Sequence, residues 1–181
     1  MVWVIWIGAG ILLVIALLAW LLWMLGRQLP AEHLVCCEVR LGRSAAEVFA
    51  VIDDTASWPG WDDGVNKVEK LESREGREAV RMHMGRNVMV LVTTRHEAPT
   101  LLERTISEEG RRPMFSGRWV HELRAEGSGC VVRLSEHGKI HQAIPRAMVR
   151  YLFDPAMYLK RHLKLLAKKF GEEGKVEVVR V

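Results

Sequence analysis

The first 26 residues carry no charged side chain, and this apolar segment constrains the chain more than any other feature. A helix rises about 1.5 Å per residue, so a segment of this length can cross a hydrocarbon core of about 30 Å. Trp3 and Trp6 lie near one end and Trp20 and Trp23 near the other, as expected for rings at two membrane interfaces. A cleaved signal peptide would need a basic start and a small-residue cleavage site, which this segment lacks. The sequence therefore predicts a transmembrane helix over residues 1–26.

The charges that follow this segment predict the side on which the rest of the chain lies. Arg27, Arg40 and Arg43 come after the span and no charged side chain precedes it, which favours a cytoplasmic position for the following residues. The chain has three cysteines, so they cannot all pair, and Cys36 and Cys37 would point to opposite faces of a strand. Reduced, buried thiols are therefore expected, consistent with a cytoplasmic location.

Residues 27–33 are predicted to be a linker, residues 34–171 one domain and residues 172–181 a tail. Residues 34–41 alternate in the manner of a strand, and Ser44 with Glu47 forms a capping box that begins a helix ending near Asp54. Between 65 and 141 the hydrophobic pattern has a period of two, interrupted by Gly and Pro. This pattern predicts an antiparallel meander with strands at 65–73, 77–84, 88–97, 101–108, 115–125 and 130–141.

The last two of these strands can be placed in register. A tight Gly-Ser turn between them sets Trp119 opposite Glu136 and His121 opposite Leu134, with Leu123 on the same face. One face of the hairpin is then apolar and the other charged, and a slip of one residue would destroy this separation. We therefore expect Trp119, His121, Leu123, Leu134 and Glu136 to face the interior.

The C-terminal region has the hydrophobic period of a helix. Apolar residues recur at steps of three and four, with a kink or restart expected where Asp154-Pro155 interrupts the pattern. A long amphipathic helix over one face of an antiparallel sheet is an α+β arrangement, and a curved sheet would enclose a space with it. The stripe comprises Val149, Leu152, Ala156, Leu159, Leu163, Leu166 and Phe170.

Three segments carry a resemblance to a known family. They are residues 45–69, with a Trp58-x-x-Trp61 corner after the first helix, residues 115–140, which open with F-x-G-x-W, and the helix from Pro145. Together they resemble the START-like helix-grip fold, also called SRPBCC, and within it the polyketide cyclase/dehydrase-type members. The resemblance covers about residues 34–170 and implies the fold, which hosts lipid carriers, hormone receptors, cyclases and chaperone activators. The apolar N-terminal segment departs from the usual members.

His121 and Glu136 are the candidate site. As diagonal neighbours on the inner face they could form an acid/base pair, anchor the polar head of a ligand, or be a purely structural ion pair. The remaining predicted cavity wall comprises Trp58, Trp61, Trp119, Leu123, Leu134, Leu152 and Leu159.

Other chemistries find little support in the sequence. Asp62 and Asp63 with Gly64 are interpreted as turn formers whose side chains bond nearby amides. The chain has no metal-ligand spacing and no phosphate-binding loop, so no metal and no cofactor is predicted; the alternative is a metal site formed by His83, His96 and His121. A net charge of +4, with no exposed aromatics among the lysines of the last helix, argues against nucleic acid as a partner. Those lysines are either solvated or positioned against anionic lipid headgroups.

Three functional hypotheses follow. The first, favoured over an enzyme, is a single-pass, membrane-anchored domain that binds a hydrophobic small molecule or lipid between the sheet and the C-terminal helix. The second is an enzyme resembling polyketide cyclases and dehydratases, which would need His121 and Glu136 in one cavity. The third is a partner-binding or chaperone-like module, for which an exposed apolar patch on the sheet would be evidence.

Overall fold

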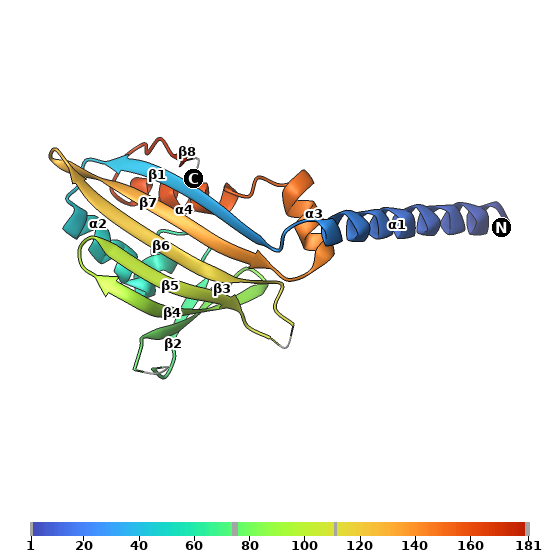
Figure 1. Ribbon diagram of the computed structural model, residues 1–181, viewed down its shortest axis with the longest axis horizontal. Helices are drawn as coiled ribbons and strands as arrows, with labels where there is room; N and C mark the ends of the chain where they lie inside the picture. The colour runs from blue at the N-terminus through green and yellow to red at the C-terminus, as the bar shows by residue number, and fades with distance from the viewer. Residues whose placement is uncertain (1, 74–75, 111, 180–181) are drawn as a thin grey trace.

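Eight strands form the sheet in the computed structural model, which describes residues 2–73, 76–110 and 112–179 (Figure 1). They are β1 (Glu32–Leu41), β2 (Lys67–Lys70), β3 (Ala79–Met84), β4 (Asn87–Glu97), β5 (Leu101–Glu108), β6 (Phe115–Glu126), β7 (Gly129–Ile140) and β8 (Glu177–Val179). The helices are α1 (Val2–Gln28), α2 (Ala45–Asp53), the 3-10 helix η1 (Thr55–Gly60), α3 (Ala143–Tyr151) and α4 (Met157–Lys169). The sheet is antiparallel throughout, in the order β2-β3-β4-β5-β6-β7-β1-β8.

This arrangement confirms the predicted α+β, START-like fold and much of its detail. Trp119 lies opposite Glu136 and His121 opposite Leu134, as the Gly-Ser turn predicted. The capping box at the start of α2 is present, with the Ser44 side chain accepting from the backbone amide of Glu47. In the predicted tail, β8 pairs with β1 and adds an edge strand.

The core lies between the sheet and α4. Leu159, Leu163 and Leu166 of α4 are fully buried, and α4 contacts β1 and β7. The helix α2 packs near β6 and β7, so that both helices lie on the same side of the sheet.

The predicted long C-terminal helix is instead two helices. The chain breaks after Tyr151 and restarts at Met157, and Asp154 Oδ1 accepts a hydrogen bond from the amide of Ala156 at 2.9 Å. The restart at Asp154-Pro155 was expected. The prediction that one continuous apolar stripe covers the sheet was wrong, because after the break only α4 packs on the sheet, whereas α3 packs mainly against α1. Leu152 is therefore 64% exposed and does not line the interior, contrary to the prediction.

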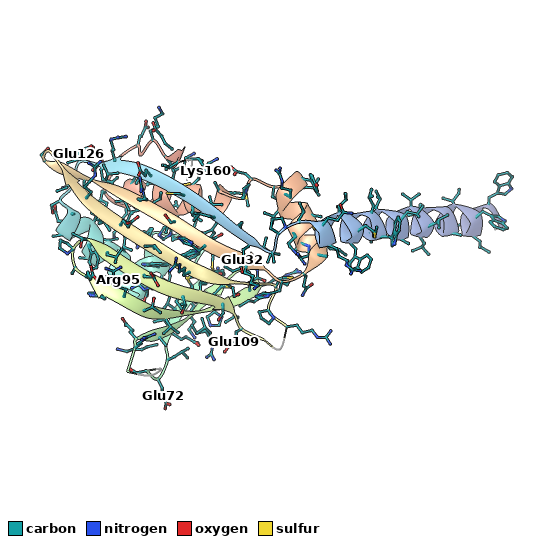
Figure 2. All side chains as sticks on the ribbon, in the orientation of Figure 1. Glu32, Glu72, Arg95, Glu109, Glu126 and Lys160 are labelled. Carbon is teal, nitrogen blue, oxygen red and sulfur yellow. The ribbon has the colours of Figure 1, made fainter. Side chains whose placement is uncertain are left out.

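The helix α1 projects away from the rest of the molecule (Figure 1). It is long and apolar enough to cross a membrane by length and composition, and Figure 2 shows its side chains standing free along most of its length. Only Leu29, Pro30 and Ala31 separate it from β1, so the connection is shorter than the predicted 27–33 linker.

The connectivity places one end of the sheet beside the base of α1. Because β1 starts there and its neighbours alternate in direction, the same end contains the end of β7, the start of β6, the end of β5, the start of β4 and the end of β3. We call this the α1 end of the sheet. In Figure 2, Glu32 lies at this end and Glu126 at the opposite one.

The contact between α1 and α3 depends on a glycine. A Cβ atom at Gly26 would overlap the backbone carbonyl of Ala143, whereas a Cβ at Gly10 would meet nothing. We expect Gly26→Ala to force α3 away from α1, at a cost of about 1–3 kcal/mol for overpacking. Trypsin should then cleave after Arg146 and Arg150 faster in this variant, in detergent micelles, than in Gly10→Ala. Equal cleavage rates in the two variants would contradict the observed packing.

Candidate functional site

A cavity of about 550 Å³ lies between the sheet and the first turns of α4. Four neighbouring strands form its inner wall through Met89, Ile106, Trp119 and Glu136, and α4 closes the other side with Tyr158 and Arg161. Methionine and aromatic side chains dominate the apolar part of this lining. Because methionine is flexible and polarisable, such a wall can adapt to ligands of different shape.

The rim of the cavity lies at the α1 end of the sheet. Gly85 in the β3–β4 turn, Asn87 at the start of β4 and Met114 before β6 line the cavity and are exposed. Asp63 and Arg161, which form an ion pair at 2.7 Å, are exposed lining residues on the side of α4. The cavity therefore meets the surface close to the end from which α1 leaves.

Glu136 is the buried carboxylate of the cavity wall. The indole Nε1–H of Trp119 donates to one of its oxygens at 2.7 Å, and His33 Nε2 lies 3.0 Å from the other. A Cβ at Gly138 would overlap the His33 ring, so this glycine makes the space through which His33 reaches Glu136. A carboxylate has about four lone-pair sites, so two contacts leave Glu136 able to accept from a ligand.

Tyr158 lies across the cavity from the sheet. Its ring stacks on Trp119, with centroids 5.2 Å apart and planes inclined by 18°, and its hydroxyl is 3.9 Å from the sulfur of Met84. Burial raises the pKa of the Tyr158 hydroxyl, which therefore stays neutral and can donate a hydrogen bond. The cavity thus combines an acceptor and a donor with apolar walls.

The structure separates the predicted site residues into two groups. Trp119 and Glu136 line the cavity. His121 does not line it, and the predicted pair with Glu136 does not form, because the Glu136 carboxylate bonds Trp119 and His33 while His121 packs against His162. The others belong to the hydrophobic core and not to the cavity lining: Trp58, Trp61, Leu123, Leu134 and Leu159.

A buried polar cluster lies beside these core residues. His162 Nδ1 is 2.7 Å from Asp62 Oδ2, and both side chains are almost fully buried. Burial raises the pKa of Asp62, but the hydrogen bond and charge of His162 and the amide of Gly64 outweigh it, so that the net pKa is lowered. Asp62 is therefore ionised at neutral pH and can only accept, which means that His162 Nδ1 carries the hydrogen.

Asp62 thus has a second role that the sequence analysis missed. Its Oδ1 accepts from the Gly64 amide at 2.9 Å, as predicted for a turn former, while its Oδ2 bonds His162. Asp63 points outward to Arg161, the residue before His162. A signal was available, because His162 lies three residues after Leu159 on the buried stripe and a buried polar side chain needs a partner.

His121 completes this cluster without a hydrogen bond. Among the described residues, neither of its ring nitrogens has a hydrogen-bond partner. Its ring packs 5.8 Å from that of His162, edge to face. Burial first, and then the charges of His162 and Arg104, lower the pKa of His121 well below its ordinary value, so the ring is neutral.

The other histidines considered for a metal lie apart. His83 Nε2 is 3.5 Å from Glu69, and His96 Nε2 is 2.8 Å from Asp53. In the described part of the chain, no three His, Cys, Asp or Glu side chains are grouped to hold a metal ion.

Comparison with known proteins agrees with this architecture. Residues 36–171 match the sequence model of a family described as polyketide cyclase/dehydrase and lipid transport. The chain belongs to this family. No curated protein matches the sequence.

Solved structures show the same fold at low sequence identity. A START superfamily protein from Mycobacterium smegmatis aligns with a TM-score of 0.62 and 15% identity, over 76% of this chain and 96% of that one. A conserved protein from Geobacillus kaustophilus aligns with a TM-score of 0.64 and 14% identity, over 80% and 99%. The di-domain ARO/CYC protein BexL of the BE-7585A biosynthetic pathway aligns with a TM-score of 0.52 and 16% identity, over 79% of this chain and 51% of that one.

The two adjacent aspartates provide a matched pair of variants. Leaving a buried polar group without its hydrogen-bond partner costs about 1–3 kcal/mol, and more where a charged group is involved, whereas exposed ion pairs contribute about 0–1 kcal/mol. We therefore expect Asp62→Ala to lower the free energy of unfolding by several times more than Asp63→Ala, as measured by urea denaturation of the full chain in detergent. Similar losses of unfolding free energy in the two variants would show that the contact between Asp62 and His162 does not stabilise the fold.

The neutral state of His121 predicts a dependence of stability on pH. An unfolded histidine titrates near pH 6.5, so below this pH the unfolded state takes up a proton. In the folded state, burial and the charges of His162 and Arg104 keep His121 unprotonated. The contribution of neutral His121 to the free energy of unfolding is thus fully present above about pH 6.5 and is lost as the pH falls. In His121→Phe we expect the drop in melting temperature between about pH 7.5 and pH 5 to be smaller.

The control for this measurement is His141→Gln, which changes an exposed histidine bonded to Ser116. It should keep the pH dependence of the unchanged chain. If His121→Phe and His141→Gln behaved alike, the titration of His121 would not contribute to acid sensitivity.

Proposed function

We propose that the protein is a membrane-anchored binding protein that takes a hydrophobic small molecule or lipid into the cavity between the sheet and α4. The observation that carries this proposal is an apolar cavity with one buried carboxylate, whose rim lies at the α1 end of the sheet. Its volume of about 550 Å³ is within the range of about 300–1,000 Å³ usual for small-molecule sites. The family to which the chain belongs includes lipid transport in its description.

In this proposal α1 is the anchor. Its exposed apolar side chains need a nonaqueous environment, and its short connection to β1 keeps the domain close to the bilayer. Arg27 follows the span, and the excess of arginine on this side favours a cytoplasmic domain. A ligand dissolved in the bilayer would then have a short path to the cavity.

The polar groups define the class of ligand. Glu136 can accept from a hydroxyl or ammonium group, and Tyr158 can donate to an oxygen, while the remaining wall suits an apolar body. A ligand with one polar end and a hydrocarbon or ring system meets these requirements. Met84, Met89 and Met114 allow the body of the ligand to vary.

A catalytic role is the second candidate, because Glu136 and Tyr158 are an acid/base-capable carboxylate and a phenol in one cavity. The fold is also that of the di-domain ARO/CYC protein, although this likeness concerns the fold alone. The form of this hypothesis that pairs His121 with Glu136 loses its support, since His121 lies outside the cavity lining. A catalyst would change the mass of the bound molecule during incubation, whereas a binding protein would release it unchanged.

The partner-binding alternative receives less support. Beyond α1, the exposed large apolar residues of the described chain lie mostly around α3 and the start of α4, and the sheet carries only Leu34 and Val178 among them. An apolar docking patch on the sheet, which this hypothesis needs, is therefore not found among the described residues.

Binding can be tested with two tryptophan variants. Met84 is half-buried at the rim of the cavity, whereas Thr105 is exposed beside the inward-facing Ile106. We expect the full chain in detergent to bind a fluorescent fatty acid or sterol, Met84→Trp to weaken this binding about tenfold by filling the cavity, and Thr105→Trp to leave it unchanged. Mass spectrometry of the purified chain should also detect a co-purifying lipid.

The control and the cavity variant separate specific binding from adsorption to apolar surfaces. Equal binding by Met84→Trp, Thr105→Trp and the unchanged chain would mean that the probe does not enter the cavity. A folded chain that binds none of the probes and carries no lipid would overturn the proposed function.

A further inference from the structure

The helix α3 is fixed at the base of α1. Gly26, near the end of α1, lies against the backbone of Ala143, and Arg146 Nη1 donates to the carbonyl oxygen of Leu29 at 3.0 Å. Figure 1 shows α3 beside the point where α1 leaves the domain. If α1 crosses a bilayer, these contacts place α3 at the boundary between membrane and water.

The end of α3 and the segment that follows it expose large apolar side chains close together. Tyr151, Leu152 and Phe153 are consecutive, and Met157 follows after the Asp154-Pro155 break; each is more than half exposed. We call these four residues the α3 patch. Apart from α1 itself, no other run of consecutive large apolar residues in the described chain is exposed in this way.

The α3 patch is flanked mainly by basic residues. Arg146 and Arg150 belong to α3 and Arg27 lies in the last turn of α1, whereas the acidic residue inside the patch, Asp154, is paired with Lys160 at 2.6 Å. The guanidinium of Arg27 lies over the ring of Trp23, 4.7 Å from its centroid. Aromatic and apolar side chains flanked by arginines are typical of helices that lie in a membrane interface and contact anionic headgroups.

The α3 patch also lies next to the cavity. Met157 is exposed, while the next residue, Tyr158, lines the cavity, so the first turn of α4 separates the patch from the candidate site. Met114, at the rim, is exposed as well. A membrane surface that contacts the α3 patch would therefore also lie close to the rim of the cavity.

We propose that the α3 patch inserts into the headgroup region of the bilayer that α1 crosses, with anionic phospholipids as the lipids it contacts. The inference rests on the membrane anchoring in the proposed function and adds a second attachment. One helix allows the domain to tilt and rotate about a short connection, whereas a second contact fixes its orientation. The rim of the cavity then faces the bilayer.

The experiment uses the full chain in nanodiscs of phosphatidylcholine and phosphatidylglycerol. A cysteine carrying an environment-sensitive fluorophore is introduced at Phe153→Cys, with Tyr151→Cys as a second variant if the first fails to fold. Leu13→Cys in α1 reports on the anchor, and Ser128→Cys, in the turn at the opposite end of the sheet, is the matched control. Quenching by lipids with nitroxide near the headgroup or in mid-chain gives the depth of each probe.

The native cysteines do not interfere with labelling under native conditions. Cys36, Cys37 and Cys130 are buried, and burial raises the pKa of Cys37 to about 11. Because the thiolate is the reactive form, these thiols react slowly compared with an exposed introduced cysteine.

We expect the probe at Phe153→Cys to be quenched about twofold by the headgroup quencher, the probe at Leu13→Cys by the mid-chain quencher, and the probe at Ser128→Cys by neither. Adding Arg150→Glu, or omitting phosphatidylglycerol, should reduce the quenching at Phe153→Cys only. If Leu13→Cys is quenched and Phe153→Cys and Tyr151→Cys are not, the inference is wrong while the anchor stands. If Leu13→Cys is not quenched, both the anchor and the inference fail, and ligand binding in the cavity is judged by its own assay.

Discussion

The buried hydrogen bond between Asp62 and His162 ties α4 to the rest of the domain, and the cavity depends on the position of α4. Asp62 belongs to the corner that follows η1, so the pair joins this corner to the middle of the helix. Tyr158 lies four residues earlier, one turn away on the same face, where it stacks on Trp119 and closes the cavity. The position of a cavity wall is thus set by a polar contact that does not itself line the cavity.

The sheet was predictable from the sequence because its determinants are local. Alternating residues, Gly and Pro at the turns and a two-residue loop between β6 and β7 are sufficient to place most strands and the register of the last hairpin, although the strand predicted at 65–73 is limited to Lys67–Lys70 and β8 was not predicted. The helix pair was only half predictable. The apolar stripe continues through Asp154-Pro155 with unchanged spacing, and spacing alone does not reveal that the chain changes direction there, so Leu152 was assigned to the interior and lies at the surface.

The site shows the same division between local and long-range information. Register identified Trp119 and Glu136, because facing on a strand follows from alternation. It did not identify which neighbour Glu136 bonds, since His33 belongs to β1, which pairs with β7, but lies 103 residues away in the sequence and reaches the carboxylate through the space left at Gly138. His121 lies on β6 and His162 on α4, and the hydrophobic pattern of either segment alone does not predict that their rings make contact.

The position of the cavity rim relative to α1 follows from connectivity and not from a special contact. Because β1 begins directly after α1 and all strand pairs are antiparallel, the β3–β4 turn and the start of β6 must lie at the same end of the sheet as α1. An anchor joined to the other end of β1 would place the same rim away from the membrane. In the proposed function, the apolar helix placed just before β1 is therefore the feature that would give a ligand in the membrane direct access to the cavity.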